Sequence, residues 1–143
     1  MRLWPVLVVL LISCEARPAE PGSAPPPTPT AKDYRIDVQP KAVTAGAPAS
    51  CEVTVTPAAP WVLKAETPFT AVLSADAGLR VDKARLDGKD FVDPKSPAKS
   101  VRTACVADNA GEHTLSAKLS FFLCSHEICK RMQSELTAVV KAN

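Results

Sequence analysis

The sequence predicts an all-β domain of the sandwich type. Two observations predict it: short runs in which apolar and polar residues alternate, and clusters of turn-forming residues between those runs. A strand of a sandwich buries one face, so its apolar side chains recur at every second position. The chain has 143 residues, which is enough for one domain of ordinary size once a leader segment is removed.

The amino terminus has the pattern of a secretion signal. Arg2 precedes an apolar run from Leu3 to Ile12, and ten residues at about 1.5 Å each cannot cross a hydrocarbon core of about 30 Å. The segment Leu11-Ile12-Ser13-Cys14 resembles the lipobox of bacterial lipoproteins, which implies cleavage before Cys14 and lipidation of that cysteine. Glu15, rather than aspartate, follows, so we expect attachment to the outer membrane on its periplasmic side. A non-lipidated export signal is the alternative.

We expect three parts: a signal peptide at 1–13, a lipidated cysteine with a proline-rich tether at 14–33, and the β-sandwich at 34–143. Glu15–Lys32 has six prolines in eighteen residues and no hydrophobic period. At about 3.1 Å per residue such a tether reaches about 50 Å. Loss of Arg2 with the signal reduces the net charge from +2 to about +1, which gives no support for nucleic-acid binding.

The first half of the domain predicts four strands. Residues 34–38, 51–56 and 69–73 carry apolar side chains at every second position, although Val72 blurs the third run. A shorter strand is expected at 79–81. Turn-forming residues separate these strands at 57–60 and 76–78. Two further clusters of turn-forming residues follow at 87–88 and 94–97.

The second half predicts three strands. Residues 101–105 alternate, and the turn 108–111 leads into the clearest strand, 113–123, where five apolar residues from Leu115 to Leu123 share one face. The last segment, from 129 onward, also alternates, and we expect a strand there. Helix is the alternative, because the segment also places apolar residues at intervals of four and contains many helix-favouring residues.

Four cysteines follow Cys14, and an even number in an exported protein indicates disulfides. Strand parity sorts them into two pairs. Cys51 and Cys105 share the parity of the core-facing residues of their strands, so both are expected to point inward. Cys124 has the parity opposite to the core face, and Cys129 matches the polar face of the last strand, so both are expected to point outward. A distortion of the strand near the turn would reverse this outer assignment.

The two pairs differ in what a bond would contribute. Cys124 and Cys129 flank a four-residue hairpin loop, where facing positions lie within disulfide range. By loop-closure entropy, a bond between Cys51 and Cys105 stabilises by about 4 kcal/mol, whereas the short loop between Cys124 and Cys129 gives only about 2 kcal/mol. The inner bond is therefore expected to be structural. The outer bond contributes less to stability, so a chemical role stays open for it.

The segment Ser120–Cys129, SFFLCSHEIC, resembles a hairpin in the amino-terminal periplasmic domain of the disulfide-interchange reductase DsbD. Trp61–Phe69 and Asp108–His113 resemble flanking segments of that family. The resemblance covers about Tyr34–Lys141, although its specific content is confined to the hairpin and its flanks. It implies an immunoglobulin-like antiparallel β-sandwich with a cysteine pair in a late hairpin. The cysteine spacing is slightly shorter here, and the proline that follows the second cysteine in the family is missing.

Three interpretations of the hairpin stay open. In the first, Cys124 and Cys129 exchange between dithiol and disulfide, with His126 and its basic neighbours favouring the thiolate. In the second, the bond is structural, and the domain is a non-catalytic structural or binding module of the envelope. In the third, Cys124, His126 and Cys129, with Met132, bind copper(I) or zinc. Disulfide formation opposes this third interpretation and no second ligand pair is present, so no metal site is expected.

The remaining motifs limit the function further. The sequence lacks a nucleophile elbow, an H-E-x-x-H pair and a phosphate-binding glycine loop, so no cofactor is expected. Whether the domain is an enzyme stays open. A thioredoxin-like or other periplasmic redox protein is expected as the electron partner, because the chain carries no redox domain of its own. Trp61 is expected in the core, and His113 is expected to pack at a strand edge rather than bind a metal.

Overall fold

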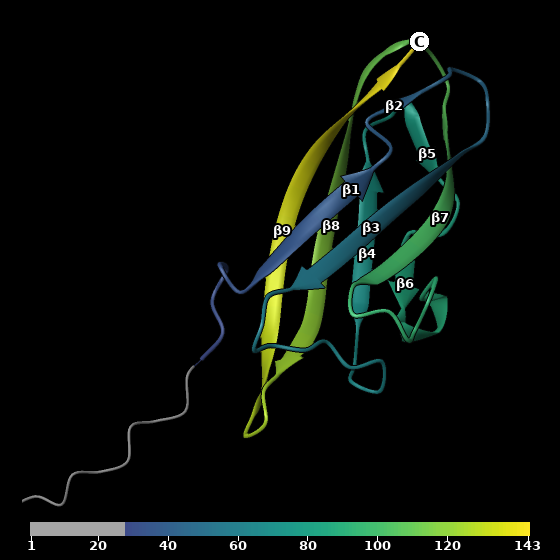
Figure 1. The fold of residues 1–143 in the computed structure, drawn as a ribbon. Coiled ribbons are helices and arrows are strands. Elements are labelled where there is room, and N and C mark those ends of the chain that lie inside the picture. Colours follow the sequence, from purple (N-terminus) through teal and green to yellow (C-terminus); the bar gives the residue numbers. More distant parts are fainter. Residues whose placement is uncertain (1–27) are drawn as a thin grey trace, which may run out of the picture.

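The computed structural model describes residues 28–143, so the expected signal peptide, Cys14 and most of the expected tether lie outside the described residues. The chain folds into two β-sheets packed face to face (Figure 1), which confirms the predicted all-β sandwich. Within residues 28–143, no helix is both long and apolar enough to cross a bilayer. The elements are β1 Tyr34–Gln39, β2 Ala42–Val43, β3 Ala49–Pro57, β4 Thr70–Ala75, β5 Leu79–Val81, β6 Arg85–Asp87, the 3-10 turn η1 Gly88–Asp90, β7 Lys99–Ala107, β8 Gly111–Cys124 and β9 Cys129–Ala142.

The first sheet has the strand order β1-β3-β7-β5, and the second has the order β2-β9-β8-β4-β6. All pairs are antiparallel except β2 with β9, which is parallel. The chain leaves the first sheet at Pro40, which has no N–H to continue the ladder of β1, and enters the second sheet at β2. The segment that contains β1 and β2 thus crosses from the first sheet to the second, and this crossing places β2 parallel to β9.

The last segment forms a strand and not a helix. β9 pairs with β8 over fourteen residues, from Ala142 opposite Gly111 to Cys129 opposite Cys124. This long pairing supplies backbone hydrogen bonds and cross-strand packing that outweigh the helix propensity of the sequence. The alternation predicted for β8 is also found, since Leu115, Ala117, Leu119, Phe121 and Leu123 are all buried.

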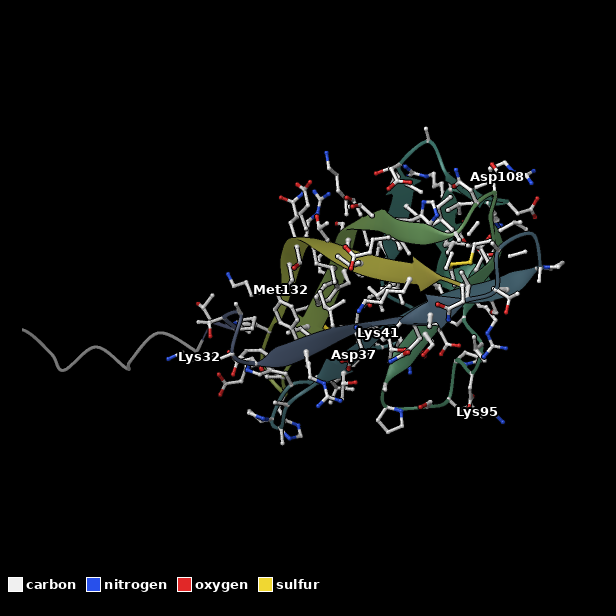
Figure 2. The ribbon with its side chains drawn as sticks, turned by 90° about the horizontal axis from the view of Figure 1, so that it is seen from above. Lys32, Asp37, Lys41, Lys95, Asp108 and Met132 are labelled. Carbon is white, nitrogen blue, oxygen red and sulfur yellow. A yellow bond between two sulfur atoms is a disulfide. The ribbon has the colours of Figure 1, made fainter. Side chains whose placement is uncertain are left out.

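The core lies between the sheets and includes the aromatic side chains of Trp61, Phe69, Phe91 and Phe121. Trp61 is buried, as predicted, and Phe69 packs edge-on against Phe91 with ring centroids 4.9 Å apart. Tyr34 from the first sheet meets Phe121 from the second at 5.1 Å, again edge to face. Most charged side chains project outward instead, as the labelled Lys32, Lys95 and Asp108 show in the view from above (Figure 2), although Lys99 is buried.

Cys51 and Cys105 form a disulfide on the core face of the first sheet. Their Cα atoms lie 5.9 Å apart, and both residues are fully buried. The bond joins diagonal neighbours in adjacent strands, because Cys51 lies opposite Thr103 and Cys105 lies opposite Ala49. It therefore holds β3 against β7 within one sheet, beneath the second sheet.

His113 at the start of β8 is a hydrogen-bonded buried side chain. Its Nδ1 lies 3.1 Å from Asp76 Oδ1, and its Nε2 lies 2.8 Å from the carbonyl oxygen of Asn109. When the ring is protonated, the Asn109 carbonyl and the Asp76 carboxylate both accept a hydrogen bond from it, and they raise the pKa of His113. The Thr114 N–H donates to Asp76 at 2.7 Å and lowers the pKa of that carboxyl. A Cβ at Gly78 would collide with the ring, so glycine is required there.

The two disulfides should contribute unequally to stability. Replacing Cys51 and Cys105 together by alanine should lower the free energy of unfolding by about 4 kcal/mol, because the bond closes a long loop of the unfolded chain. Replacing Cys124 and Cys129 together should cost at most about 2 kcal/mol. Urea unfolding, extrapolated to water, measures both losses. An equal or larger loss for the hairpin pair would contradict this ranking.

Stability should fall as the pH rises above neutrality. The folded-state pKa of His113 is raised from its usual 6.5, so its contribution is fully present below 6.5 and is lost as the pH rises through the folded value. Asp76 stays ionised across this range because its pKa is lowered. Urea midpoints between pH 5.5 and 9 should therefore decline for the wild type, and a His113→Gln variant should lack that part of the decline. Parallel profiles for the two proteins would show that His113 does not titrate as proposed.

Candidate functional site

The hairpin between β8 and β9 carries the second disulfide. Cys124 ends β8 and Cys129 begins β9, directly opposite one another with Cα atoms 4.0 Å apart. Ser125 holds the turn between them: its N–H donates to the Ile128 carbonyl at 2.8 Å, and its Oγ accepts from the N–H groups of Glu127 and Ile128. Serine suits this place because its short hydroxyl can satisfy backbone donors two and three residues further on.

Cys124 differs from the prediction. It has the outward parity of Phe122, as expected, but it is buried, with only 1% of its surface exposed. The reason is a bridge to Val62: the Val62 N–H donates to the Cys124 carbonyl at 2.9 Å, and the Cys124 N–H donates to the Val62 carbonyl at 2.8 Å. Cys124 is thus flanked by Val62 on one side and by Cys129 on the other. The expectation of an exposed Cys124 is therefore wrong.

Cys129, by contrast, is exposed, as predicted. Both backbone groups of Cys124 are bonded to Val62, so they cannot also bond to Cys129, and the two cysteines form a non-hydrogen-bonded pair. The N–H and C=O of Cys129 consequently point away from β8. Among residues 28–143, β2 alone pairs with that edge of β9, and it reaches only Lys141 and Ala142. The disulfide therefore has one enclosed end and one open end.

Two hollows lie on the outer face of the second sheet near this bond. The first, of about 300 Å³, is lined by Pro60, Val62, Lys64, Cys124, Ser125 and His126. It brings the segment before β4 together with the hairpin turn, and Val62 in it is 49% exposed. The second, of about 280 Å³, is lined by Pro68, Thr70, Ser120, Phe122 and Arg131. An incoming side chain can therefore reach the disulfide from an open face.

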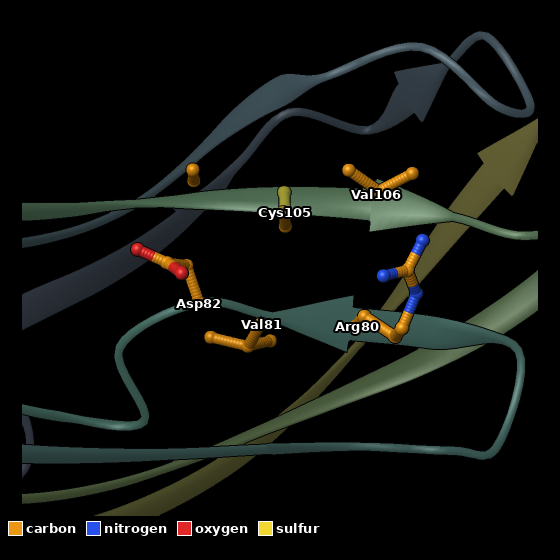
Figure 3. A pocket seen from close by; sticks show the side chains of 6 residues that line it. Arg80, Val81, Asp82, Cys105 and Val106 are labelled. Carbon is orange, nitrogen blue, oxygen red and sulfur yellow. The ribbon is translucent and has the colours of Figure 1, made fainter.

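A third hollow lies on the first sheet, beside β5 and β7 (Figure 3). Arg80, Asp82 and Cys105 are among the residues that line it. Arg80 is bound to Asp108 at 2.8 Å, and the sulfur of Cys105 is bonded to Cys51 in the core. No free thiol lines this hollow, so the hairpin is the better candidate for thiol chemistry.

The metal interpretation has little support from this geometry. The metal interpretation uses Cys124, Cys129 and Met132 as ligands together with His126. The sulfur atoms of Cys124 and Cys129 are bonded to each other, so neither is free as a thiolate ligand. Within residues 28–143, no group of three or more His, Cys, Asp or Glu side chains is placed to hold a metal ion. His113 is occupied by Asp76 and Asn109.

The sequence prediction missed the contribution of the segment before β4. Trp61 and Leu63 are buried while Val62 and Lys64 are exposed, which is the alternation of a strand. The pattern is hard to recognise because the exposed Val62 is itself apolar. The resemblance noted for Trp61–Phe69 was the one signal that pointed to this segment.

No known protein family and no curated protein matches this sequence. Solved structures with a similar chain course include WR4, a member of the MSP family from C. elegans, with 11% identity and a TM-score of 0.41 over 76% of this chain and 97% of that one. AggA, the major subunit of aggregative adherence fimbriae type I from Escherichia coli, has 13% identity and a TM-score of 0.40 over 77% and 94%. The PapD-like domain 7 of human CEP192 has 7% identity and a TM-score of 0.35 over 87% and 96%. These values are too low to transfer any function.

Proposed function

We propose that the domain is a thiol–disulfide exchange module that acts through Cys124 and Cys129. The observation that carries the proposal is the asymmetry of this bond: Cys129 is exposed on an open edge, while Cys124 is enclosed at a hollow reachable from solvent. The bond between Cys51 and Cys105 serves as the contrast, since both of its residues are fully buried. Exchange requires access of a thiolate to a sulfur atom, and only the hairpin bond offers it.

The asymmetry assigns an order to the reaction. The thiolate of a partner protein attacks the sulfur of Cys129, forms a mixed disulfide there and displaces Cys124 as a thiolate. A second thiolate of the partner then attacks the partner's own sulfur in the mixed disulfide and releases Cys129. The partner dithiol loses two electrons and becomes a disulfide, while Cys124 and Cys129 gain them and take up protons from solvent. The reverse sequence, in which the Cys124 and Cys129 dithiol is oxidised, reduces a partner disulfide, so the same geometry serves both directions.

The surroundings of Cys124 suit a leaving thiolate. Lys64 and His126 line the same hollow as Cys124, and positive charge nearby stabilises a thiolate over a thiol. Glu127 in the turn acts against this effect, but it does not line the hollow. His126 is therefore a modulating residue in this scheme, and the two cysteines carry the exchange.

The proposal includes the setting of the domain. Cys14 is lipidated after signal cleavage, and the proline-rich tether places the domain on the periplasmic side of the envelope, at the outer membrane. The resemblance of the hairpin to the amino-terminal domain of DsbD supports this setting. A thioredoxin-like or other periplasmic redox protein supplies or accepts the electrons.

The reduction potential of the hairpin bond tests the proposal. Exchange predicts a value near about −200 mV, whereas a structural bond lies below about −300 mV. Equilibration in a series of thiol buffers, followed by alkylation and mass mapping, measures the potential of each bond separately. The pair Cys51 and Cys105 is the internal control and should stay oxidised in buffers that open the hairpin bond.

Two results would contradict the proposal. One is a hairpin potential below about −300 mV. The other is opening of both bonds over the same range of buffers. Either result would favour the second function, a structural or binding module of the envelope in which both disulfides only stabilise the fold.

A further inference from the structure

Three basic side chains near the hairpin have no ionic partner among the described residues. Lys64, Lys130 and Arg131 form no ion pair with any residue in 28–143, although Arg131 donates from Nε to the Ser120 hydroxyl at 2.9 Å. Several other basic side chains of the domain are paired. These pairs are Arg35 with Asp37, Arg80 with Asp108, Lys83 with Asp90, and Arg102 with Glu52.

The two hollows beside the disulfide share this sign of charge. Lys64 lines the first hollow and Arg131 lines the second, while no aspartate or glutamate lines either one. Glu66 and Glu127 are the nearest acidic residues along the chain, and both are exposed outside these linings. An incoming group therefore meets a positively charged rim, formed by Lys64 and Arg131, on the outer face of the sheet beside the disulfide.

We infer that this rim selects a partner segment in which the reacting cysteine is flanked by acidic side chains. The inference rests on the proposed exchange function and names the chemistry of its partner. Lys64 lies on the side of the Val62 bridge, and Arg131 lies two residues after Cys129 on the same face of β9, whereas Lys130 lies on the other face, opposite Leu123. Acidic residues on either side of a partner cysteine would thus each face a positive charge when its sulfur reaches Cys129.

Two physical effects make the rim selective. Opposite charges steer the encounter and raise the association rate, an effect that salt suppresses. The partner's attacking sulfur is also negative, and its charge passes to the sulfur of Cys124, so the same basic side chains favour the exchange step itself. A basic partner segment would be repelled by Lys64 and Arg131. Exposed Val62 and half-buried Phe122 add apolar contact area without changing this preference.

Small thiols of different charge test the inference on the protein itself. The rate of opening of the bond between Cys124 and Cys129 is measured with 2-mercaptoethanesulfonate, 2-mercaptoethanol and cysteamine, which are anionic, neutral and cationic. Each rate is divided by the rate of the same thiol with a small neutral disulfide, which removes differences in intrinsic reactivity. At low ionic strength the anionic thiol should be at least about fivefold faster than the cationic one. The ratio should approach one near 1 M salt, where the Debye length is about 3 Å.

Charge reversal at two exposed positions locates the effect. Lys64→Glu should reduce the anionic-to-cationic rate ratio to about one, or invert it, at low ionic strength. Lys41→Glu is the matched control, because it changes the net charge equally. Lys41 is exposed and lies at the opposite end of β9, where its carbonyl oxygen accepts from Lys141, about 40 Å along the strand from Cys129. The control should leave the ratio within about twofold of the wild type.

The results separate this inference from the proposed function. An anionic-to-cationic ratio near one for the wild type at low ionic strength would overturn the inference, and so would equal effects of Lys64→Glu and Lys41→Glu. The proposed exchange function is tested separately, by the reduction potential of the bond between Cys124 and Cys129 in the wild type. That potential is not used to calculate the rate ratios. A charge-selective bond with a very negative potential would therefore overturn only the proposed function.

Discussion

The backbone bridge between Val62 and Cys124 is the contact on which the site depends. It bonds both backbone groups of Cys124 to the segment before β4, so that Cys124 is enclosed although its side chain lies on the outer parity of β8. The same bridge turns the hydrogen-bonding groups of Cys129 toward the unpaired edge of β9. It also brings Lys64 and the apolar Val62 next to the hairpin turn. One pair of hydrogen bonds thus sets which sulfur is open and what surrounds it.

The two disulfides illustrate how strand phase separates a fully buried bond from one with an exposed end. Both bonds join neighbouring strands of a single sheet, one diagonally across β3 and β7 and the other directly across β8 and β9. Cys51 and Cys105 have inward parity and are covered by the second sheet, whereas the hairpin pair has outward parity. A shift of one residue in either strand would exchange these environments, because side chains alternate between the faces of a sheet.

Much of this architecture follows from local pattern in the sequence. The alternation of β8 and the facing positions of Cys124 and Cys129 could be predicted, since both depend on residues close in the chain. The two-residue strand β2 could not, because its pairing with β9 is set by where the chain crosses between sheets. The burial of Cys124 was missed for a similar reason: it depends on Val62, which is distant in sequence. The bonds of His113 to Asp76 and Asn109 are likewise tertiary contacts that no period in the sequence reveals.

Amide hydrogen exchange at the two hairpin cysteines tests the central claim most directly. The Cys124 N–H donates to the Val62 carbonyl, so it should be protected, whereas the Cys129 N–H faces the unpaired edge and should exchange rapidly. Protection at Cys124 should persist after the disulfide is reduced, because the bridge to Val62 does not include the sulfur atoms. Exchange at Cys124 as fast as at Cys129 in the oxidised protein would mean that the bridge is not formed, and the asymmetry of the bond would be lost with it.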